Sequence, residues 1–413
     1  MPLSTIEDAI EAYARGEFLI VVDDEDRENE GDLIIAADAM TPEKMAFMIR
    51  HTSGVICAPM SDERADALDL PLMVVDNTES MRTAFTVSVD LLEGTSTGIS
   101  ASDRSATVVA LADDGRQRTA FARPGHIFPL RARAGGVLKR AGHTEAAVDL
   151  CALSNRQPVG VLCEIVNDDG TMARVPDLEA FAAEHDLHFV SIADLIRHRR
   201  RHEKLVEHFG SARIPTRYGD FTAHAYVSLL DDEEHVAYVL GDLASVDAPL
   251  VRVHSECLTG DLLGSLRCDC GSQLDAALDR IGAEGVGVVV YLRGHEGRGI
   301  GIGHKLRAYG LQDEGLDTVD ANLQQGLPVD SREYGVGAQM LSDLGITRMR
   351  LMTNNPAKYG GLDGYGLEIT GRVPLDTAPN PENVRYLETK RDRLGHMLPA
   401  GDGIEAVGEV DAS

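Results

Sequence analysis

Apolar residues recur along the chain with two different periods, and these periods predict its secondary structure. Runs such as FLIVVDD at 18–24 and DLIIAADA at 32–39 have the length and composition of buried strands. Stretches with a period near 3.6 predict helices. The first helix is expected to begin with a capping box formed by Ser4 and Glu7 and to end at about Ala14. Because both patterns continue through the sequence, we expect an α/β or α+β fold.

The pattern breaks once, near the middle of the chain. VSIADLIRHRR (190–200) predicts a closing helix, and FTAHAYVSLL (221–230) begins a new series of strands. A chain of 413 residues has the length of two ordinary domains. We therefore expect a two-domain protein, with domains at 1–200 and 201–400. The small, polar and acidic residues at 401–413 predict a disordered tail.

The charge and composition exclude several classes of protein. The net charge is −28, which disfavours binding to nucleic acid because contacts with phosphates supply most of that affinity. The basic run at 199–204 is better explained as a helix end, where positive charge is favourable. No apolar run is long enough to span a membrane, and the start of the chain lacks the features of a signal peptide. We therefore expect a cytoplasmic protein that does not bind membranes.

Three of the six cysteines lie close together in HSECLTGDLLGSLRCDCGSQ (254–273). In a reducing compartment, clustered thiols are more typical of metal ligands than of disulfides. Cys257, Cys268 and Cys270 supply three thiolates, which leaves the fourth position of a zinc ion open for water, as in catalytic sites. His254 would close the site as a fourth ligand. Ordinary buried cysteines are the alternative without a metal.

Further motifs in the second half have both a functional and an ordinary interpretation. The predicted strand at 287–292 runs into a glycine-rich loop and a helix, which favours anion binding or is simply a tight turn. Asp330 and Arg332 are expected at a helix start, where Asp330 has a functional role or is just the helix N-cap. Lys358 follows the turn signal Asn-Asn-Pro and is either functional or an ordinary surface lysine.

Five segments of the second half together resemble GTP cyclohydrolase II over residues 205–375. They are RVHSECLTGDLLGSLRCDCGSQL, GHEGRGIG, DTVDAN, LPVDSREYGVGAQ and TNNPAKYGGLDGYG. The resemblance implies a zinc ion on Cys257, Cys268 and Cys270, with a water that attacks C8 of guanine, and the loss of formate and pyrophosphate. It also implies that GTP is bound by Arg252, Val253, His254, Ser255, Glu256, Gln273, Glu296, Gly297, Arg298, Thr318, Thr353 and Lys358.

Three further residues are implied to act in this reaction. Arg332 matches the residue proposed as nucleophile at the α-phosphate, and Asp330 matches its proton acceptor. A guanidinium stays protonated up to pH ~12, so a phosphate clamp is the alternative role for Arg332. Tyr309 matches a residue on the helix after the glycine-rich loop and is implied to assist at the reacting ring.

The first half contains an acidic segment and a basic segment. In DDEDRENEGDL (23–33), the acids Asp26, Glu28, Glu30 and Asp32 would lie on one face, about 6.6 Å apart, if the segment is extended. Such a row binds a divalent cation or is a solvated acidic turn. RAGGVLKRAGHTEA (133–146) combines glycines with basic side chains, which is typical of a phosphate site.

The first half resembles 3,4-dihydroxy-2-butanone 4-phosphate synthase over residues 3–198. The matching segments are DDEDRENEGDL, FTVSVD, TGISASDR, RPGHIFPLRARAGGVLKRAGHTEA and VLCEI. The implied reaction converts D-ribulose 5-phosphate to dihydroxybutanone phosphate and formate, with Mg²⁺ or Mn²⁺ on Glu28 and His143. The implied catalytic residues are His126, Glu164 and Glu30, and the implied substrate-binding residues are Arg27, Glu28, Asp32, Thr97, Arg140, Ala141, Gly142, His143, Thr144 and Glu164.

The two halves in this order resemble the bifunctional proteins of riboflavin biosynthesis. The resemblance implies two separate sites that act on two small phosphorylated substrates, and a homodimer. Three alternatives remain at this point. One half is inactive and structural, or the chain is a zinc-stabilised nucleotide-binding module, or it binds nucleic acid through the basic run at 199–204.

Overall fold

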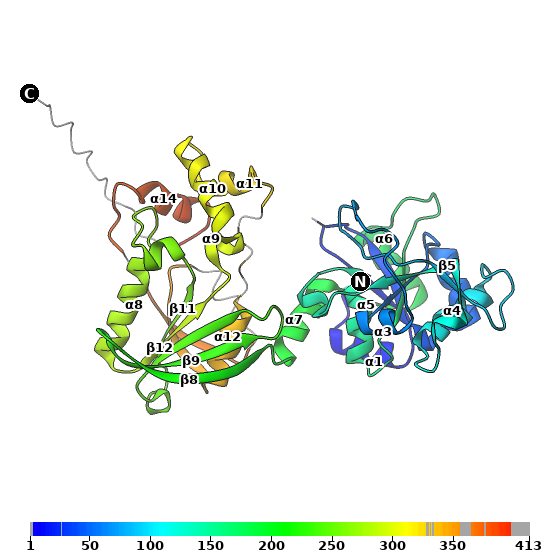
Figure 1. Ribbon diagram of the computed structural model, residues 1–413, viewed down its shortest axis with the longest axis horizontal. Helices are drawn as coiled ribbons and strands as arrows, with labels where there is room; N and C mark the ends of the chain where they lie inside the picture. Colours follow the sequence, from blue (N-terminus) through cyan, green and yellow to red (C-terminus); the bar gives the residue numbers. More distant parts are fainter. Residues whose placement is uncertain are drawn as a thin grey trace, which may run out of the picture. The chain divides into compact units, whose positions relative to one another are not determined.

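Two seven-stranded mixed sheets form the centres of two units, Met1–His202 and Glu203–Ser413 (Figure 1). The computed structural model describes residues 3–25, 27–327, 330, 332, 334–355, 365–375 and 377–397. Asp26, Lys358 and the tail at 401–413 lie outside the described residues. None of the helices in these ranges is long and apolar enough to cross a membrane.

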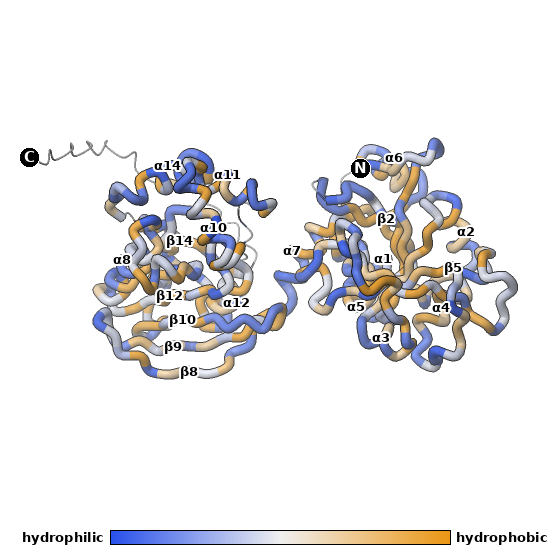
Figure 2. Tube along the Cα trace, turned by 45° about the horizontal axis from the view of Figure 1, so that its top comes forward, coloured by the Kyte–Doolittle hydropathy of each residue, from blue (hydrophilic) through white to orange (hydrophobic). Residues whose placement is uncertain are grey.

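The N-terminal sheet is covered by helices on both faces. The strand order is β4 (Val89–Leu91), β5 (Phe121–Arg131), β3 (Cys57–Met60), β6 (Gly160–Glu164), β2 (Gly31–Ala36), β1 (Leu19–Val22) and β7 (His188–Ser191). One face packs on α2 (Pro42–His51), α3 (Asp62–Ala67), α4 (Ala101–Ala112) and α6 (Val175–His185). The other packs on α1 (Ile6–Ala14), α5 (His143–Leu153) and α7 (Ile192–His202). Burial on both faces explains why β2 is drawn mostly in hydrophobic colours in Figure 2.

The C-terminal sheet combines an antiparallel part with a parallel part. The strand order is β14 (Glu368–Val373), β13 (Arg348–Met352), β11 (Leu250–Ser255), β12 (Gly287–Leu292), β10 (Glu234–Leu240), β9 (Gly219–Ser228) and β8 (Val206–Thr216). Strands β11 to β14 are parallel to one another, and β8 to β10 are antiparallel neighbours. The helices are α8 (Cys270–Glu284), α9 (Glu296–Gly299), α10 (Gly301–Asp313), α11 (Thr318–Leu323), α12 (Gly335–Asp343) and α14 (Val384–Asp392).

The expected two-domain α/β architecture is confirmed, but some local predictions are wrong. The first helix is capped by Thr5, whose hydroxyl accepts from the N–H of Asp8, whereas the Ser4 hydroxyl accepts from the N–H of Phe189. The strands of the second domain were expected to begin at 221, yet β8 (Val206–Thr216) comes before that position. Its residues alternate less clearly because most of its side chains are exposed.

The sheet core predicts a clear difference between two leucines. Leu33 on β2 is fully buried, whereas Leu92 is 59% exposed. We expect Leu33→Ala to lower the free energy of unfolding by about 2–5 kcal/mol because it leaves a cavity. Leu92→Ala should change it by no more than about 0.5 kcal/mol. Calorimetry of the full chain measures both, and equal effects would contradict the assigned core.

Candidate active sites

The first candidate site lies where three parallel strands of the C-terminal sheet end. The chain passes from β11 to β12 on one side and later returns to β13 on the other side of β11. Such a reversal leaves a crevice at the carboxyl ends of the strands, where ligands bind in open α/β sheets. Ser255 ends β11, and Thr353 directly follows β13. An open pocket of about 990 Å³, including the solvent at its mouth, occupies this place.

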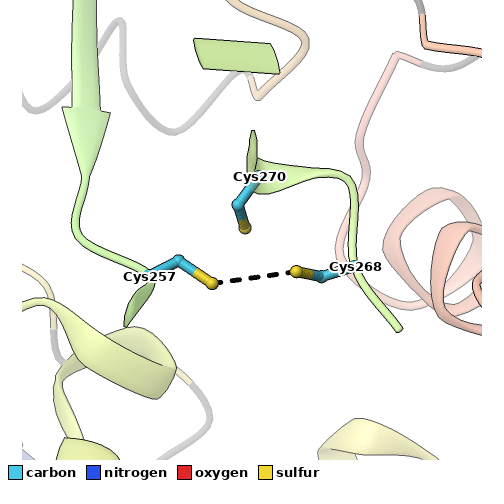
Figure 3. Close-up of side chains that lie close together, drawn as sticks. All are labelled: Cys257, Cys268 and Cys270. Carbon is cyan, nitrogen blue, oxygen red and sulfur yellow. Dashed lines mark hydrogen bonds between the residues drawn. The ribbon is translucent and has the colours of Figure 1, made fainter. Parts of the chain in front are cut away.

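Three thiols meet at one side of this pocket (Figure 3). Cys257 follows β11, and Cys268 and Cys270 come from the start of α8. The three sulfur atoms lie within 4.8 Å of one another, and those of Cys257 and Cys268 are 3.7 Å apart. Gly260 lies against them, because a Cβ atom there would be 2.8 Å from the sulfur of Cys268 and 3.0 Å from that of Cys257. The donor set fits a thiophilic metal ion.

A buried lysine stabilises the negative charge of this cluster. The ammonium of Lys305 on α10 donates to the sulfur of Cys257 at 3.0 Å and to Glu296 at 2.5 Å. Hydrogen bonds from Cys268 and Cys270, together with this ammonium, lower the pKa of Cys257 well below its ordinary value. The hydrogen bond to Cys257 and burial raise the pKa of Cys268 to about 11. Without a metal ion, the state with one thiolate at Cys257 is therefore favoured over the state in which all three thiols are deprotonated.

The pocket collects positive side chains around the thiols. Arg252, Arg298, Arg332, Lys305 and Lys390 all line it. The Nε atom of Arg252 is buried and has no hydrogen-bond partner among the residues that the structure describes. So many cations around one crevice favour an anionic ligand with several charges.

The second candidate site lies in one row across the N-terminal sheet. Asp32 on β2 pairs directly with Glu164 on β6. Leu162, two residues before Glu164, pairs with Cys57 on β3, and Cys57 pairs with Phe128 on β5. Residues two apart on a strand share a face, so His126, two residues before Phe128, lies on the same face and at the same level as Glu164. The register thus aligns Asp32, Glu164 and His126.

A buried histidine joins this row to the turn between β1 and β2. The Nδ1 atom of His143, the first residue of α5, lies 3.7 Å from Glu28 and 3.9 Å from Asp32. Burial opposes the charged imidazole, but Asp32, Glu28 and Asp23 outweigh it and raise the pKa of His143 to about 9. Burial raises the pKa of Asp32 to about 7. Ligand atoms of Asp23, Glu28 and His143 lie within 4.8 Å of one another.

This cluster has room for one more positive charge. The Oδ1 atom of Asp32 is buried and has no hydrogen-bond partner in the described part of the chain. A buried carboxylate oxygen without a partner is costly. Carboxylate oxygens with one imidazole fit Mg²⁺ or Mn²⁺. The donor set therefore fits a divalent cation.

Two arginines lie beside the N-terminus of α5. Gly142 lies against both side chains, because a Cβ atom there would be 2.4 Å from the guanidinium of Arg140 and 3.1 Å from that of Arg27. Arg27 also pairs with Asp23 at 2.7 Å, and Arg140 pairs with the buried Glu145 at 2.7 Å. Guanidinium groups next to the start of an 11-residue helix are typical of phosphate-binding sites.

Comparison with known proteins decides the family. The 3,4-dihydroxy-2-butanone 4-phosphate synthase family matches residues 7–198, and the GTP cyclohydrolase II family matches residues 207–374. The riboflavin biosynthesis protein RibBA of Salinispora arenicola is 62% identical over 402 residues, which cover 97% of this chain and 96% of that protein. The chain belongs to the bifunctional riboflavin biosynthesis proteins.

A plant relative agrees with this assignment, and a solved structure agrees with the two-domain fold. The bifunctional riboflavin biosynthesis protein RIBA 1, chloroplastic, of Arabidopsis thaliana is 60% identical over 98% of this chain and 75% of that protein. The crystal structure of RibBX, a two-domain 3,4-dihydroxy-2-butanone 4-phosphate synthase from A. baumannii, has a TM-score of 0.70 and 36% identity, and covers 91% of this chain and 100% of that chain. The chain is thus a bifunctional enzyme, with a 3,4-dihydroxy-2-butanone 4-phosphate synthase domain followed by a GTP cyclohydrolase II domain.

Most of the residues predicted for the GTP cyclohydrolase II domain line the pocket. They are Arg252, His254, Ser255, Glu256, Cys257, Cys268, Cys270, Gln273, Gly297, Arg298, Tyr309, Thr318, Arg332 and Thr353. Val253 is instead part of the core. Glu296 contacts the pocket through Lys305 and also accepts from the N–H of Leu258. Lys358 lies outside the described residues.

His254 contacts a carboxylate, and Asp330 differs from its ordinary interpretation as a helix N-cap. The Nε2 atom of His254 lies 3.1 Å from both carboxylate oxygens of Asp261, and His254 is not part of the three-thiol donor group. Asp330 is not a helix N-cap, because α12 begins after Tyr334. Its carboxylate instead binds the Arg332 guanidinium through both oxygens, with Oδ1 2.8 Å from Nε.

Sequence reasoning missed the contribution of the C-terminal helix. Tyr386 and Lys390 of α14, and His396 after it, line the pocket although they lie beyond the segments that resemble GTP cyclohydrolase II. Lys390 donates to Asp269 at 2.7 Å, and both side chains are buried. Asp269 separates two cysteines of the cluster, and an acid that is buried there needs a cation. An acid between two clustered cysteines therefore indicates, from the sequence alone, that a positively charged side chain lies nearby. The sequence does not indicate which residue supplies it.

In the synthase domain, the acidic row is not extended. The N–H groups of Glu28 and Glu30 donate to the carboxylate of Asp23, so the segment between β1 and β2 is a turn. A turn brings Glu28 to His143 and adds Asp23, which was not predicted. Asp26 of the expected row lies outside the described residues.

The remaining predicted residues of the synthase domain lie in four places. His143 and Thr144 are the first residues of α5, Gly142 is its N-cap, and Arg140 and Ala141 precede it. Glu30 precedes β2, and burial together with Glu164 raises its pKa. Thr97 is exposed on the loop before α4. The His126 ring contacts Asp90 on β4.

The buried ion pair predicts a strong effect of Lys390. We expect Lys390→Met to lower the free energy of unfolding by about 3–5 kcal/mol, because it leaves the charge of Asp269 buried without its partner. The matched control is Lys204→Met, which removes an exposed ion pair with Asp343 at 3.2 Å and should cost at most about 1 kcal/mol. Calorimetry of the full chain compares them; a Lys390→Met effect no larger than the control would contradict the assigned pair.

Proposed function

We propose that the two reactions take place at the two clusters described above. The N-terminal unit converts D-ribulose 5-phosphate to 3,4-dihydroxy-2-butanone 4-phosphate and formate. The C-terminal unit hydrolyses GTP to 2,5-diamino-6-ribosylamino-pyrimidinone 5'-phosphate, formate and pyrophosphate. The observation that supports this proposal is that, in each unit, a cluster of thiols or of acids with a histidine lies beside basic side chains. The cell compartment that fits these reactions is the cytoplasm.

In the GTP site, Cys257, Cys268 and Cys270 hold a zinc ion. Bound there, zinc supplies a water that is acidic enough to act as a nucleophile near neutral pH. Lys305 offsets the excess negative charge of three thiolates through its hydrogen bond to Cys257. Tyr309 lines the same pocket and assists at the guanine ring.

The arginines of the GTP site bind the phosphates. The Asp330 carboxylate holds the guanidinium of Arg332 through two hydrogen bonds. Burial opposes the positive charge of Arg332, but the contact with Asp330 outweighs it and raises the pKa of Arg332 above its ordinary value. A guanidinium that is held protonated is a poor nucleophile and a good clamp for phosphate oxygens. We therefore assign Arg332 to phosphate binding, with Arg252 and Arg298, which line the same pocket.

In the sugar phosphate site, Glu28 and His143 hold Mg²⁺ or Mn²⁺. Bound there, the cation polarises the sugar oxygens. Arg27, Arg140 and the start of α5 bind the phosphate, while Asp32 and Thr144 lie beside it. His126 and Glu164, which the register aligns, remove and return protons on the sugar carbons.

The other interpretations of the sequence explain less. A zinc-stabilised binding module or a nucleic-acid-binding protein does not account for the second donor cluster beside Arg27 and Arg140. A chain with one inactive half would keep the same donor residues in both units. Only an assay of both reactions distinguishes such a chain from one with two active halves. A homodimer remains our expectation, and sedimentation of the full chain tests it.

Substitution of one donor in each cluster tests the assignment of the sites. We expect Cys268→Ala to abolish formate release from GTP and zinc binding, while formate release from ribulose 5-phosphate continues. Glu28→Gln should do the reverse, with a loss of at least about 100-fold in the sugar reaction. Both reactions are measured as formate with the purified full chain and Mg²⁺.

Two control variants make this test specific. Cys151→Ala removes a buried thiol of the N-terminal core, next to Tyr13, and should keep zinc. Glu25→Gln removes an exposed acid of the same turn and should keep both reactions. Equal loss of both reactions in either donor variant would contradict two separate sites.

The raised pKa of His143 predicts how metal binding depends on pH. Without metal, His143 is protonated at pH 7 because its pKa is about 9. A metal binds only the neutral ring, so binding must release this proton. The affinity for Mn²⁺ should therefore rise by about tenfold per pH unit from 7 towards 9 and then level off.

Titration calorimetry in two buffers of different ionisation enthalpy measures both the affinity and the released proton. His143→Asn is the control. We expect this variant to bind Mn²⁺ more weakly, with an affinity that changes much less between pH 7 and 9. An affinity of the unsubstituted chain that does not change between pH 7 and 9 would remove His143 as a ligand.

A further inference from the structure

Three segments of the synthase domain that are distant in sequence meet at one hydrogen bond. Asp90 comes from the edge strand β4, Gly98 from the loop before α4, and His126 from β5. The Oδ2 atom of Asp90 lies 2.7 Å from Nδ1 of His126. The Oδ1 atom of the same carboxylate accepts from the backbone N–H of His126 at 2.8 Å. One carboxylate therefore fixes both the ring and the backbone of one residue.

This contact decides which ring nitrogen of His126 carries the proton. A carboxylate only accepts hydrogen bonds, so Nδ1 must be the donor. In the neutral ring, Nε2 is then left with its lone pair and is able to take a proton. The His126 side chain is 42% exposed, whereas that of Asp90 is only 12% exposed. The ring is thus anchored on its buried side and open on its other side.

Gly98 closes the buried side of this pair. Its φ is +87°, and a Cβ atom there would lie 2.0 Å from Oδ2 of Asp90 and 2.8 Å from Nδ1 of His126. The loop is held in place by Asp103, which accepts from the N–H groups of Ser96 at 3.2 Å and Gly98 at 3.0 Å. The backbone of the loop therefore packs directly on the hydrogen bond and shields it from water.

We propose that Asp90 is a positioning residue that fixes the tautomer and the orientation of His126 for proton transfer in the sugar reaction. The proposal rests on the proposed function of the N-terminal unit. Asp90 does not touch the substrate. It acts through His126, which lies in the same row as Glu164 and Asp32. The competing interpretation is that the contact only ties β4 to β5.

Asp90→Asn separates these two interpretations. The amide has the same shape, but its NH₂ group donates to Nδ1 and so favours the opposite tautomer. We expect kcat for formate release from ribulose 5-phosphate to fall by about 10²- to 10⁴-fold, with a much smaller change in KM. Nitrogen NMR of the full chain, with His126 assigned by its loss in His126→Asn, should show the proton moving from Nδ1 to Nε2.

The matched control is Asp103→Asn, which weakens a buried carboxylate at the start of α4 that holds the same loop, without touching His126. We expect a lower melting temperature in this variant and an unchanged His126 tautomer. Wild-type kcat in Asp90→Asn, or a loss of kcat with the tautomer unchanged, would overturn the proposal. If the unsubstituted chain releases no formate from ribulose 5-phosphate, the proposed function of the N-terminal unit is wrong. If NMR of that chain shows the proton of His126 on Nε2, the tautomer assignment is wrong whatever the activity.

Discussion

Both sites depend on the cost of holding donors of the same charge close together. The three sulfur atoms lie within 4.8 Å of one another, and without a metal the proton stays on Cys268, whose pKa is about 11. In the other unit, burial raises the pKa of Asp32 to about 7, and its Oδ1 atom has no hydrogen-bond partner among the described residues. A bound cation removes this cost in both places, which couples metal binding to the geometry of each site.

The two sheets hold the residues of each site close together despite this repulsion. In the C-terminal unit, the reversal of strand order at β11 places the ends of three parallel strands around one pocket. In the N-terminal unit, pairing across β2, β6, β3 and β5 aligns Asp32, Glu164 and His126 in one row. Side chains on strands move little, so the distances among Asp32, Glu164 and His126 stay fixed. Loops and helix starts then add the adaptable partners, Lys305 on α10 and His143 on α5.

Strands with strong apolar patterns were predictable from the sequence, and 287–292 agrees with β12. The cluster of three thiols was also predictable from their spacing, and the structure brings their sulfur atoms within 4.8 Å of one another. Contacts over long distances were not predictable. The pairing of Lys390 with Asp269 joins residues 121 positions apart, and the turn that adds Asp23 to the His143 cluster follows from backbone hydrogen bonds rather than from the spacing of acids. Local sequence determines propensity, whereas only tertiary packing determines which buried charges meet.

X-ray absorption at the zinc edge of the purified full chain tests the central claim most directly. One zinc per chain is expected, with three sulfur atoms at about 2.3 Å and one oxygen at about 2.0 Å. This result means that Cys257, Cys268 and Cys270 hold the ion and that its fourth position is open to water. A fourth protein ligand, such as an imidazole from His254, would make the site closed and structural. A folded chain that binds no zinc would contradict the thiol cluster as a metal site.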